Sequence, residues 1–205
     1  MKRVTSLVLS LLLAGCVQQP AMQASTGHPN LIIVRDFSFT AGEVTLDPSF
    51  GFSLNRGQAG TPPRERAASV GRAAAFTTAD TITQQLANLG YDVAASDASG
   101  PDPGGRALIV TGRFLSIDEG HRRRVGAENA SVSVDVEIDV QVAGGSPVRI
   151  TSLQFDSRRV PRSATLSGSD ARGANVNAAA VRVGSAIARQ VAETAQLNHW
   201  PGGTR

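Results

Sequence analysis

The chain has 205 residues, of which 41% are hydrophobic and 18% charged, a composition that fits one globular domain and excludes a disordered chain or a collagen. The only long apolar run, Val4 to Leu13, would span about 15 Å as a helix, about half the hydrocarbon thickness of a bilayer, which excludes a membrane channel. The formal net charge of +3 includes Lys2 and Arg3, and without them 18 basic side chains face 17 acidic ones, so the charge gives no support for nucleic-acid binding.

The start of the chain has the form of a secretory signal. Lys2 and Arg3 precede the apolar run, and Leu13-Ala14-Gly15-Cys16 follows it. This ending resembles the lipobox of bacterial lipoproteins. The resemblance implies a signal peptide over residues 1–15, whose removal leaves Cys16 as a lipidated N-terminus bearing acyl chains such as palmitate. Two or more such chains anchor a protein stably in a membrane. The alternative is an ordinary cleaved signal with a chance cysteine, which would leave an unpaired thiol in an oxidising compartment.

Residues 16–30 are predicted to form the lipidated N-terminus and a flexible tether. Gln18 to Asn30 contains two prolines, one glycine and no charge, as is typical of a linker. In enterobacterial lipoproteins an aspartate after the lipidated cysteine favours the inner membrane, and Val17 stands at that position here. The resemblance therefore implies a cell-envelope location at the outer membrane, facing the periplasm, ahead of the inner membrane.

The folded part is predicted to begin with a strand over Leu31 to Phe39, which is apolar at first and then alternates. Thr40 to Arg64 carries four glycines and three prolines and predicts a long loop. Two alternatives remain for this segment: it contains a short hairpin or helical turn around Phe50 to Leu54, or it is a mobile binding loop. Glu65 to Leu89 predicts the first helix, with a stripe of apolar residues comprising Ala68, Ala75, Ala79, Ile82, Leu86 and Leu89.

Four more strands and a second helix follow. The strands are expected over Tyr91 to Ala95, Ala107 to Ile117, Ser131 to Val142 and Val148 to Phe155. In the third of these, apolar and polar residues alternate without a break, which predicts one buried and one wet sheet face. The order β-α-β-β-β-β-α predicts a single α+β domain over residues 31–197, with a mostly antiparallel sheet, two helices packed on one face, and a C-terminal tail over 198–205.

The second helix is predicted over Asn175 to Leu197, with an apolar stripe formed by Val176, Ala180, Val183, Ile187 and Val191. A second face of this helix is rich in small residues that suit close helix packing. A surface for a homo-oligomer is the alternative for part of that face. Its members are Ala178, Ala179, Gly184, Ser185, Ala188 and Ala192.

A turn between two of the strands carries a family resemblance. Gly112-Arg113-Phe114-Leu115-Ser116-Ile117-Asp118-Glu119-Gly120 is followed by Arg122 to Arg124, Gly126 and the alternating strand. This arrangement resembles the DUF4410 family of uncharacterised bacterial lipoproteins, over Leu31 to Leu197. We assign structural roles in the turn to Gly112, Asp118, Gly120 and Gly126.

The same turn offers two interpretations. In one, it is a solvated turn whose charges compensate each other. In the other, Asp118 accepts backbone N–H groups and fixes the turn, while Arg122, Arg123 and Arg124 bind phosphate or carboxylate groups of a partner. The first is the more common outcome for such a charge cluster.

No catalytic residue, cofactor or metal site is predicted. Asp118, Glu119 and His121 are near neighbours along a turning chain, so their side chains diverge and do not form a converging ligand set. The carboxylates of Asp135, Glu137 and Asp139 are expected on the wet face of a strand, balanced by an arginine on a neighbouring strand. The candidate arginines are Arg113, Arg149 and Arg158.

These observations predict a non-enzymatic, membrane-anchored lipoprotein that serves envelope interaction or assembly. Its expected partners are the membrane, through the lipid on Cys16, and an unknown envelope protein, with no nucleic acid. The alternative is a periplasmic module that binds a small acidic ligand. That module would use the segment Thr40 to Arg64 together with the Arg122 to Arg124 turn.

Overall fold

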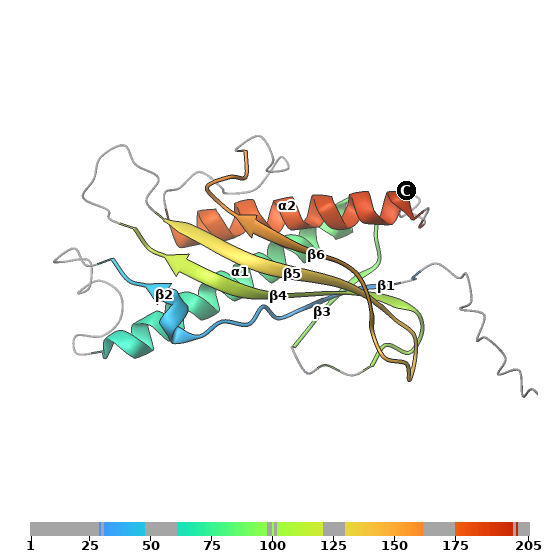
Figure 1. Ribbon diagram of the computed structural model, residues 1–205, viewed down its shortest axis with the longest axis horizontal. Helices are drawn as coiled ribbons and strands as arrows, with labels where there is room; N and C mark the ends of the chain where they lie inside the picture. Colours follow the sequence, from blue (N-terminus) through green and yellow to red (C-terminus); the bar gives the residue numbers. More distant parts are fainter. Residues whose placement is uncertain are drawn as a thin grey trace, which may run out of the picture.

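The elements follow the predicted order with two short additions near the start, a 3-10 helix and a strand. The computed structural model describes residues 29, 31–47, 61–97, 100, 102–120, 130–161, 175–198 and 200. The described elements are β1 (Leu31–Arg35), the 3-10 helix η1 (Ala41–Glu43), β2 (Val44–Thr45), α1 (Pro63–Asn88), β3 (Val93–Ser96), β4 (Ala107–Asp118), β5 (Ser131–Gln141), β6 (Val148–Asp156) and α2 (Val176–Leu197). The predicted α+β class is confirmed, with one mixed sheet and two helices (Figure 1).

The sheet joins a parallel half to an antiparallel half. Its strand order is β3-β1-β4-β5-β6, and β2 pairs with β4. The three longest strands, β4, β5 and β6, are antiparallel neighbours, as expected. Among the described strands, β1 pairs in parallel with β3 and β4, and β2 with β4, and an isolated parallel bridge joins residues 38 and 113. The parallel pairing means that β1, β3 and β4 all begin at the same end of the sheet, with α1 as the crossover between β1 and β3.

The first strand is shorter than predicted, because the chain changes neighbours after Arg35. Asp36 N–H donates to Ser96 O at 3.0 Å on the β3 side, whereas Ser38 forms an isolated bridge with Arg113 of β4. Between them Phe37 turns into the core and is 3% exposed. The predicted loop over 40–64 contains η1 and β2, and the turn considered around residues 50–54 lies outside the described residues.

The core lies between one face of the sheet and both helices. Alternate residues of β1, β4 and β5 enter one cluster with the apolar faces of α1 and α2. All five residues of the predicted α2 stripe are buried. The α1 stripe is only partly correct, since Leu89 lies just after the helix and is 43% exposed. Within the described part of the chain, neither helix has the length and hydropathy needed to cross a bilayer.

The small-residue face of α2 is a contact with α1. A Cβ added at Gly184 would lie 2.9 Å from Thr81 Cβ and 3.0 Å from Thr78 O, so the two helices approach closely there. Ala179, Ser185 and Ala188 on the same helix are fully buried. This face is therefore part of the core, and the oligomer surface considered for it is not available.

The domain has two distinct ends (Figure 1). We call the end where β1 begins the proximal end, and it also carries the C-terminal ends of both helices and the turn between β5 and β6. We call the opposite end the distal end. It carries β2, the end of β4, the beginning of β5 and the end of β6.

Candidate functional site at the distal end

Asp118 lies where three parts of the chain meet. It is the last residue of β4 and pairs with Thr45 of β2. Its Oδ2 accepts a hydrogen bond from the Arg158 guanidinium, just beyond β6, at 3.3 Å. These three positions stand close to the segments 48–60, 121–129 and 162–174, which lie outside the described residues. The fold therefore brings the stems of all three segments together at the distal end.

The end of β4 is held by a short turn. Asp118 Oδ1 accepts the Gly120 N–H at 2.7 Å, and Gly120 has a φ of 66°, in the left-handed region that favours glycine. Beside this turn, Asp47 N–H donates to a Glu119 carboxylate oxygen at 3.1 Å, and Glu119 N–H donates to Thr45 O at 3.0 Å. The path of the chain is therefore defined up to Gly120.

Of the remaining predicted site residues, one is described and five are not. Gly112 lies in the middle of β4, so it belongs to the strand and not to the turn. A Cβ at this position would press on Cε1 and Cδ1 of the Phe37 ring and lie 2.9 Å from its Cζ. Gly112 is therefore required for packing. The anion-binding candidates Arg122, Arg123 and Arg124, the glycine Gly126 and the lipidation candidate Cys16 lie outside the described residues.

The wet face of the sheet carries a ladder of paired charges. Arg149 of β6 donates from Nε to Asp139 and from a terminal nitrogen to Glu137 of β5, each at 2.5 Å. The hydrogen bond with Asp139 is the main cause that raises the pKa of Arg149. Arg113 stands opposite Asp135 in the register of β4 and β5. The prediction that arginines on neighbouring strands balance these carboxylates is confirmed for Arg149. Arg113 lies opposite Asp135 but forms its ion pair with Glu43, and Arg158 pairs with Asp118.

Arg113 also ties the sheet to η1. Its guanidinium donates to Glu43 Oε1 at 2.9 Å, and Thr40 N–H donates to Glu43 Oε2 at 2.6 Å. Burial by itself would raise the pKa of Glu43, but the hydrogen bonds from Arg113 and Thr40 outweigh it and hold the pKa below the usual glutamate value. The carboxylate is therefore ionised at neutral pH and fastens the start of the segment that leads to β2.

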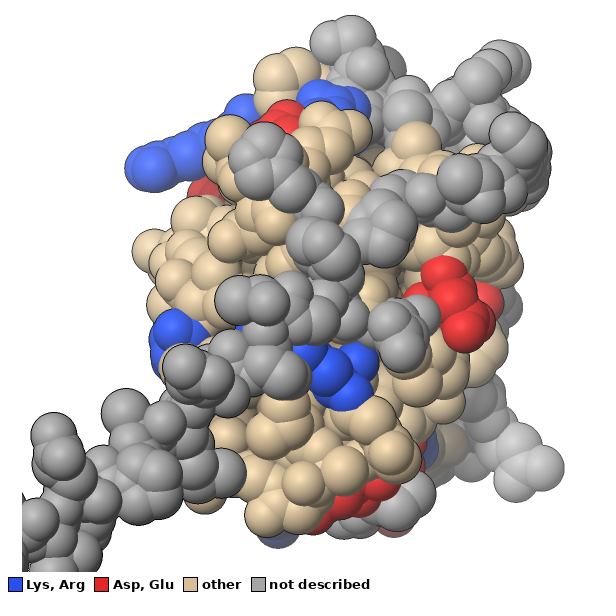
Figure 2. Space-filling view, turned by 90° about the vertical axis from the view of Figure 1, so that its right-hand side faces the viewer, with Lys and Arg blue, Asp and Glu red and all other residues tan. Residues whose placement is uncertain are grey.

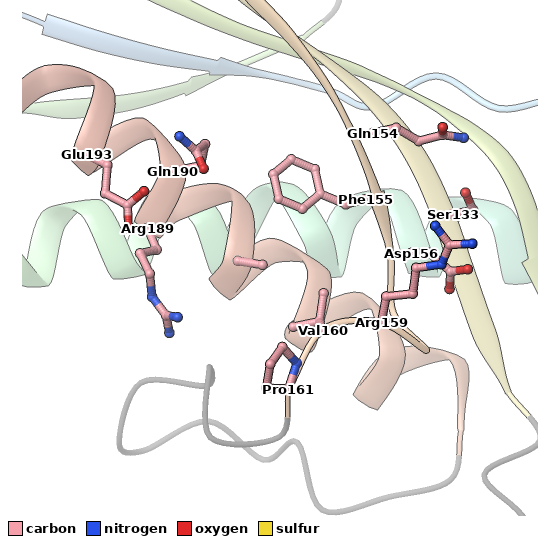
Figure 3. Close-up of a pocket in the computed structure, with 11 residues that line it drawn as sticks. Ser133, Gln154, Phe155, Asp156, Arg159, Val160, Pro161, Arg189, Gln190 and Glu193 are labelled. Carbon is pink, nitrogen blue, oxygen red and sulfur yellow. The ribbon is translucent and has the colours of Figure 1, made fainter. Parts of the chain in front are cut away.

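A groove of about 510 Å³ runs beside this end, between α2 and β6. Two arginines and two carboxylates from different elements stand around it, on an apolar base that includes Phe155 (Figure 3). The groove follows the sheet edge, since β6 is the last strand and pairs only with β5 among the described strands. The charged lining residues are Asp156, Arg159, Arg189 and Glu193.

Sequence reasoning missed this groove. Arg159 follows a strand and Arg189 lies on a helix, 30 positions apart, so no spacing rule relates them. The one local signal is the pair Arg189 and Glu193, which are four residues apart and share a face of α2. Within the described residues, no three histidine, cysteine, aspartate or glutamate side chains converge in an arrangement that could hold a metal ion.

Comparison with known proteins identifies the family. No curated protein matches the chain. Among solved structures, two PelC dodecamers from Paraburkholderia phytofirmans are similar to it. One is 12% identical with a TM-score of 0.37, covering 78% of this chain and 83% of the other, and the second is 11% identical with a TM-score of 0.35, covering 78% and 84%. At these TM-scores the similarity supports no statement about function. The model of a domain of unknown function, DUF4410, matches residues 32–157, from β1 to just beyond β6. Because this match covers more than half of the chain, the protein belongs to the DUF4410 family.

Proposed function

We propose that this protein is a non-enzymatic bacterial lipoprotein, anchored to the outer membrane by a lipid on Cys16 and facing the periplasm. In this proposal it serves envelope interaction or assembly, and it contacts its envelope partner with the distal end of the domain. The observation that carries the proposal is that β2, the end of β4 and the residues just after β6 meet around Asp118, at the end of the domain opposite to Leu31. A chain anchored upstream of Leu31 would present that end to the periplasm.

In this proposal, the arginines that follow the Asp118 turn in the sequence supply the chemistry of the contact. In the sequence, one histidine separates Gly120 from Arg122, Arg123 and Arg124, so the segment that carries these arginines starts at the Asp118 turn. Guanidinium groups bind carboxylates and phosphates through paired N–H donors. Acidic groups on an envelope protein are therefore the expected contacts.

The lipid anchor is tested by the mass of the mature N-terminus. Membranes from cells expressing the full chain should yield a protein that starts at Cys16 and carries acyl chains, and radiolabelled palmitate should enter it. The variant Cys16→Ala should take up no label and leave the membrane fraction. A mature protein with an unmodified Cys16, or one cleaved at another position, would refute the anchor.

The distal contact is tested by site-directed cross-linking in living cells. A photoreactive amino acid at Arg158 should yield a reproducible cross-linked protein, and the triple variant Arg122→Gln, Arg123→Gln, Arg124→Gln should weaken that product. Phe76 on α1 is the matched control position because its side chain is 71% exposed and lies away from the distal turn. Equal cross-linking from both positions, or none from Arg158, would count against a partner at this end.

The groove favours a second candidate function, the binding of a small acidic ligand. Arg159 and Arg189 come from the two walls of the groove and would be the anion-binding groups. Asp156 and Glu193 stand in the same lining, so a ligand that carries an amine beside its acid group fits better than a simple dianion. Calorimetric titration with an amino dicarboxylic acid such as aspartate would test it. Binding that Arg159→Gln abolishes would support this function, and the absence of binding heat would reject it for this ligand.

A further inference from the structure

Exposed apolar side chains gather at the proximal end. Among the described residues, the large hydrophobic side chains that remain exposed number seven, and only Phe76 and Leu115 lie away from this end. A set of this kind on one end of a domain is a typical mark of an interaction surface. The other five are Leu89 at 43%, Val142 at 43%, Val148 at 66%, Ile150 at 37% and Leu197 at 79% exposed.

Sheet register and helix direction place these residues at the same end of the domain. Leu31 pairs with Ala107, and Ala107 pairs with Gln141, so the first residue of β1 shares a row with the last residue of β5. Val142 follows in the turn to β6, and Val148 begins β6. The C-terminal ends of α1 and α2 point the same way (Figure 1). Ile32 N–H donates to Asp92 O at 2.9 Å, which ties the chain just after Leu89 to β1.

The proximal end is also poor in charge. Figure 2 looks onto it, and residues other than Lys, Arg, Asp and Glu make up most of its described surface, with Lys or Arg and Asp or Glu side chains visible at several places around it. Trp200, the only tryptophan of the chain, packs against the core beside the end of α2, where its backbone N–H donates to Ala195 O at 2.9 Å. Leucine, valine and tryptophan at an end with few charged side chains suit contact with lipid at the boundary of headgroups and acyl chains.

The position of Cys16 favours the membrane as the partner of this surface. A chain of 15 residues between Cys16 and Leu31 reaches at most about 50 Å, and as a random coil it spans about 20 Å. The 26 residues of α1 extend over about 39 Å. An anchor at Cys16 therefore holds Leu31 nearer to the membrane than the distal end for most of the time, and this raises the local concentration of the proximal end at the lipid surface.

We infer that the proximal end docks on the same bilayer that holds the lipid of Cys16, with Leu89, Leu197 and the Val142 to Val148 turn in contact with lipid. This inference rests on the proposed function. It goes beyond that function because it assigns a second, non-covalent membrane contact to the folded domain. Docking of this kind orients the domain, so that the distal end and its Asp118 turn point away from the membrane.

Site-directed spin labelling tests the contact. In the lipidated chain Cys16 is blocked, so a single introduced cysteine is the only free thiol. Leu197→Cys carries the label at the proximal end, and Phe76→Cys is the matched control, since both positions are apolar and highly exposed. Phe76 lies 13 residues before Leu89, or about 20 Å back along α1. The mature lipoprotein is reconstituted in vesicles of phosphatidylethanolamine and phosphatidylglycerol.

The label at position 197 is expected to be several-fold less accessible to a water-soluble nickel complex than the label at 76, and more accessible to oxygen. Equal exposure of both labels to water in a protein that floats with the vesicles would overturn the inference. In a second pair, Val148→Cys carries the label with and without Leu89→Ser and Leu197→Ser. The two serines should move this label into water, and an unchanged depth would refute the role of the leucines.

Vesicle flotation separates failure of the anchor from failure of the docking. A full chain that is not lipidated and does not float refutes the proposed function. The inference is then judged with Cys16→Ser chains that carry a hexahistidine sequence at position 16 and bind nickel-chelating lipid in the same vesicles. A protected label at 197 in that arrangement supports docking by the domain itself, and an exposed one rejects it.

Discussion

The contact between Gly112 and Phe37 allows a sharp test of the packing at the centre of the sheet. Gly112→Ala would place a methyl group against the Phe37 ring, with 2.9 Å to Cζ and still less to two other ring carbons. An ordinary carbon–carbon contact is about 3.5–4.0 Å, so the ring must retreat by roughly 1 Å or more. Phe37 is 3% exposed and its ring centroid stands 6.1 Å from that of Phe114, so the core offers little room for this movement.

Two effects oppose each other in this variant. Replacing a strand glycine by alanine without a clash would stabilise the protein by about 0.5–1 kcal/mol, because alanine loses less backbone entropy on folding. Overpacking of a core costs about 1–3 kcal/mol. The clash dominates, and we expect a net loss of about 1–2 kcal/mol. For a chain of this size that loss lowers Tm by about 2–8 °C.

Thermal and urea denaturation of four variants measure the effect. Gly104→Ala is the control, because a Cβ at that position meets no atom within 4 Å, and its stability should change by less than about 0.5 kcal/mol. Phe37→Leu replaces the ring by an aliphatic side chain that lacks Cε1 and Cζ, two of the three atoms that a Cβ at position 112 would meet. The double variant Gly112→Ala with Phe37→Leu should therefore lose less than the sum of the two single losses. A Gly112→Ala protein as stable as the parent, or strict additivity in the double variant, would refute the packing argument.

Three further outcomes are expected. Asp118→Ala should lower the free energy of unfolding, measured by urea denaturation, by about 1 kcal/mol, because the acceptor of the Gly120 N–H is lost. Asp118→Asn keeps that acceptor and should cost less than half as much, because the ion pair with Arg158 is largely exposed. Equal losses of stability in the two variants would assign the effect to the ion pair. Gly144→Ala should lower Tm, since the residue has a φ of 67°, and the cost of about 1 kcal/mol should be smaller for Gly144→Asn. The pKa of Glu43 is lowered in the folded protein, so its ionised carboxylate stabilises the fold at neutral pH. This stabilisation is lost as the pH falls below about 4.3, the usual glutamate pKa, and through the lowered value. The difference in unfolding midpoint between the parent and Glu43→Gln should shrink there, and a difference that stays constant on acidification would contradict it.

Much of the fold was predictable because the relevant information is local. The alternation from Ser131 to Val142 assigns alternate residues to opposite faces of β5, and the valines from 132 to 136 are indeed fully buried. The apolar stripe of α2 is buried throughout for the same reason, since a helix repeats its exposure every 3.6 residues. Asp118 and Gly120, two positions apart, form the turn with a bond that involves no distant residue.

Tertiary structure alone decided the features that depend on which elements become neighbours. No local pattern shows that Phe37 leaves the first strand to cover Gly112, or that Leu89 falls outside the core while sharing an end with Val148. The groove beside β6 likewise needs Arg159 and Arg189 on two walls that only the packed domain sets side by side. The periodicity of a segment determines which of its sides is apolar. Which apolar sides pack against one another depends on the tertiary structure, because each side is buried only by contact with another element.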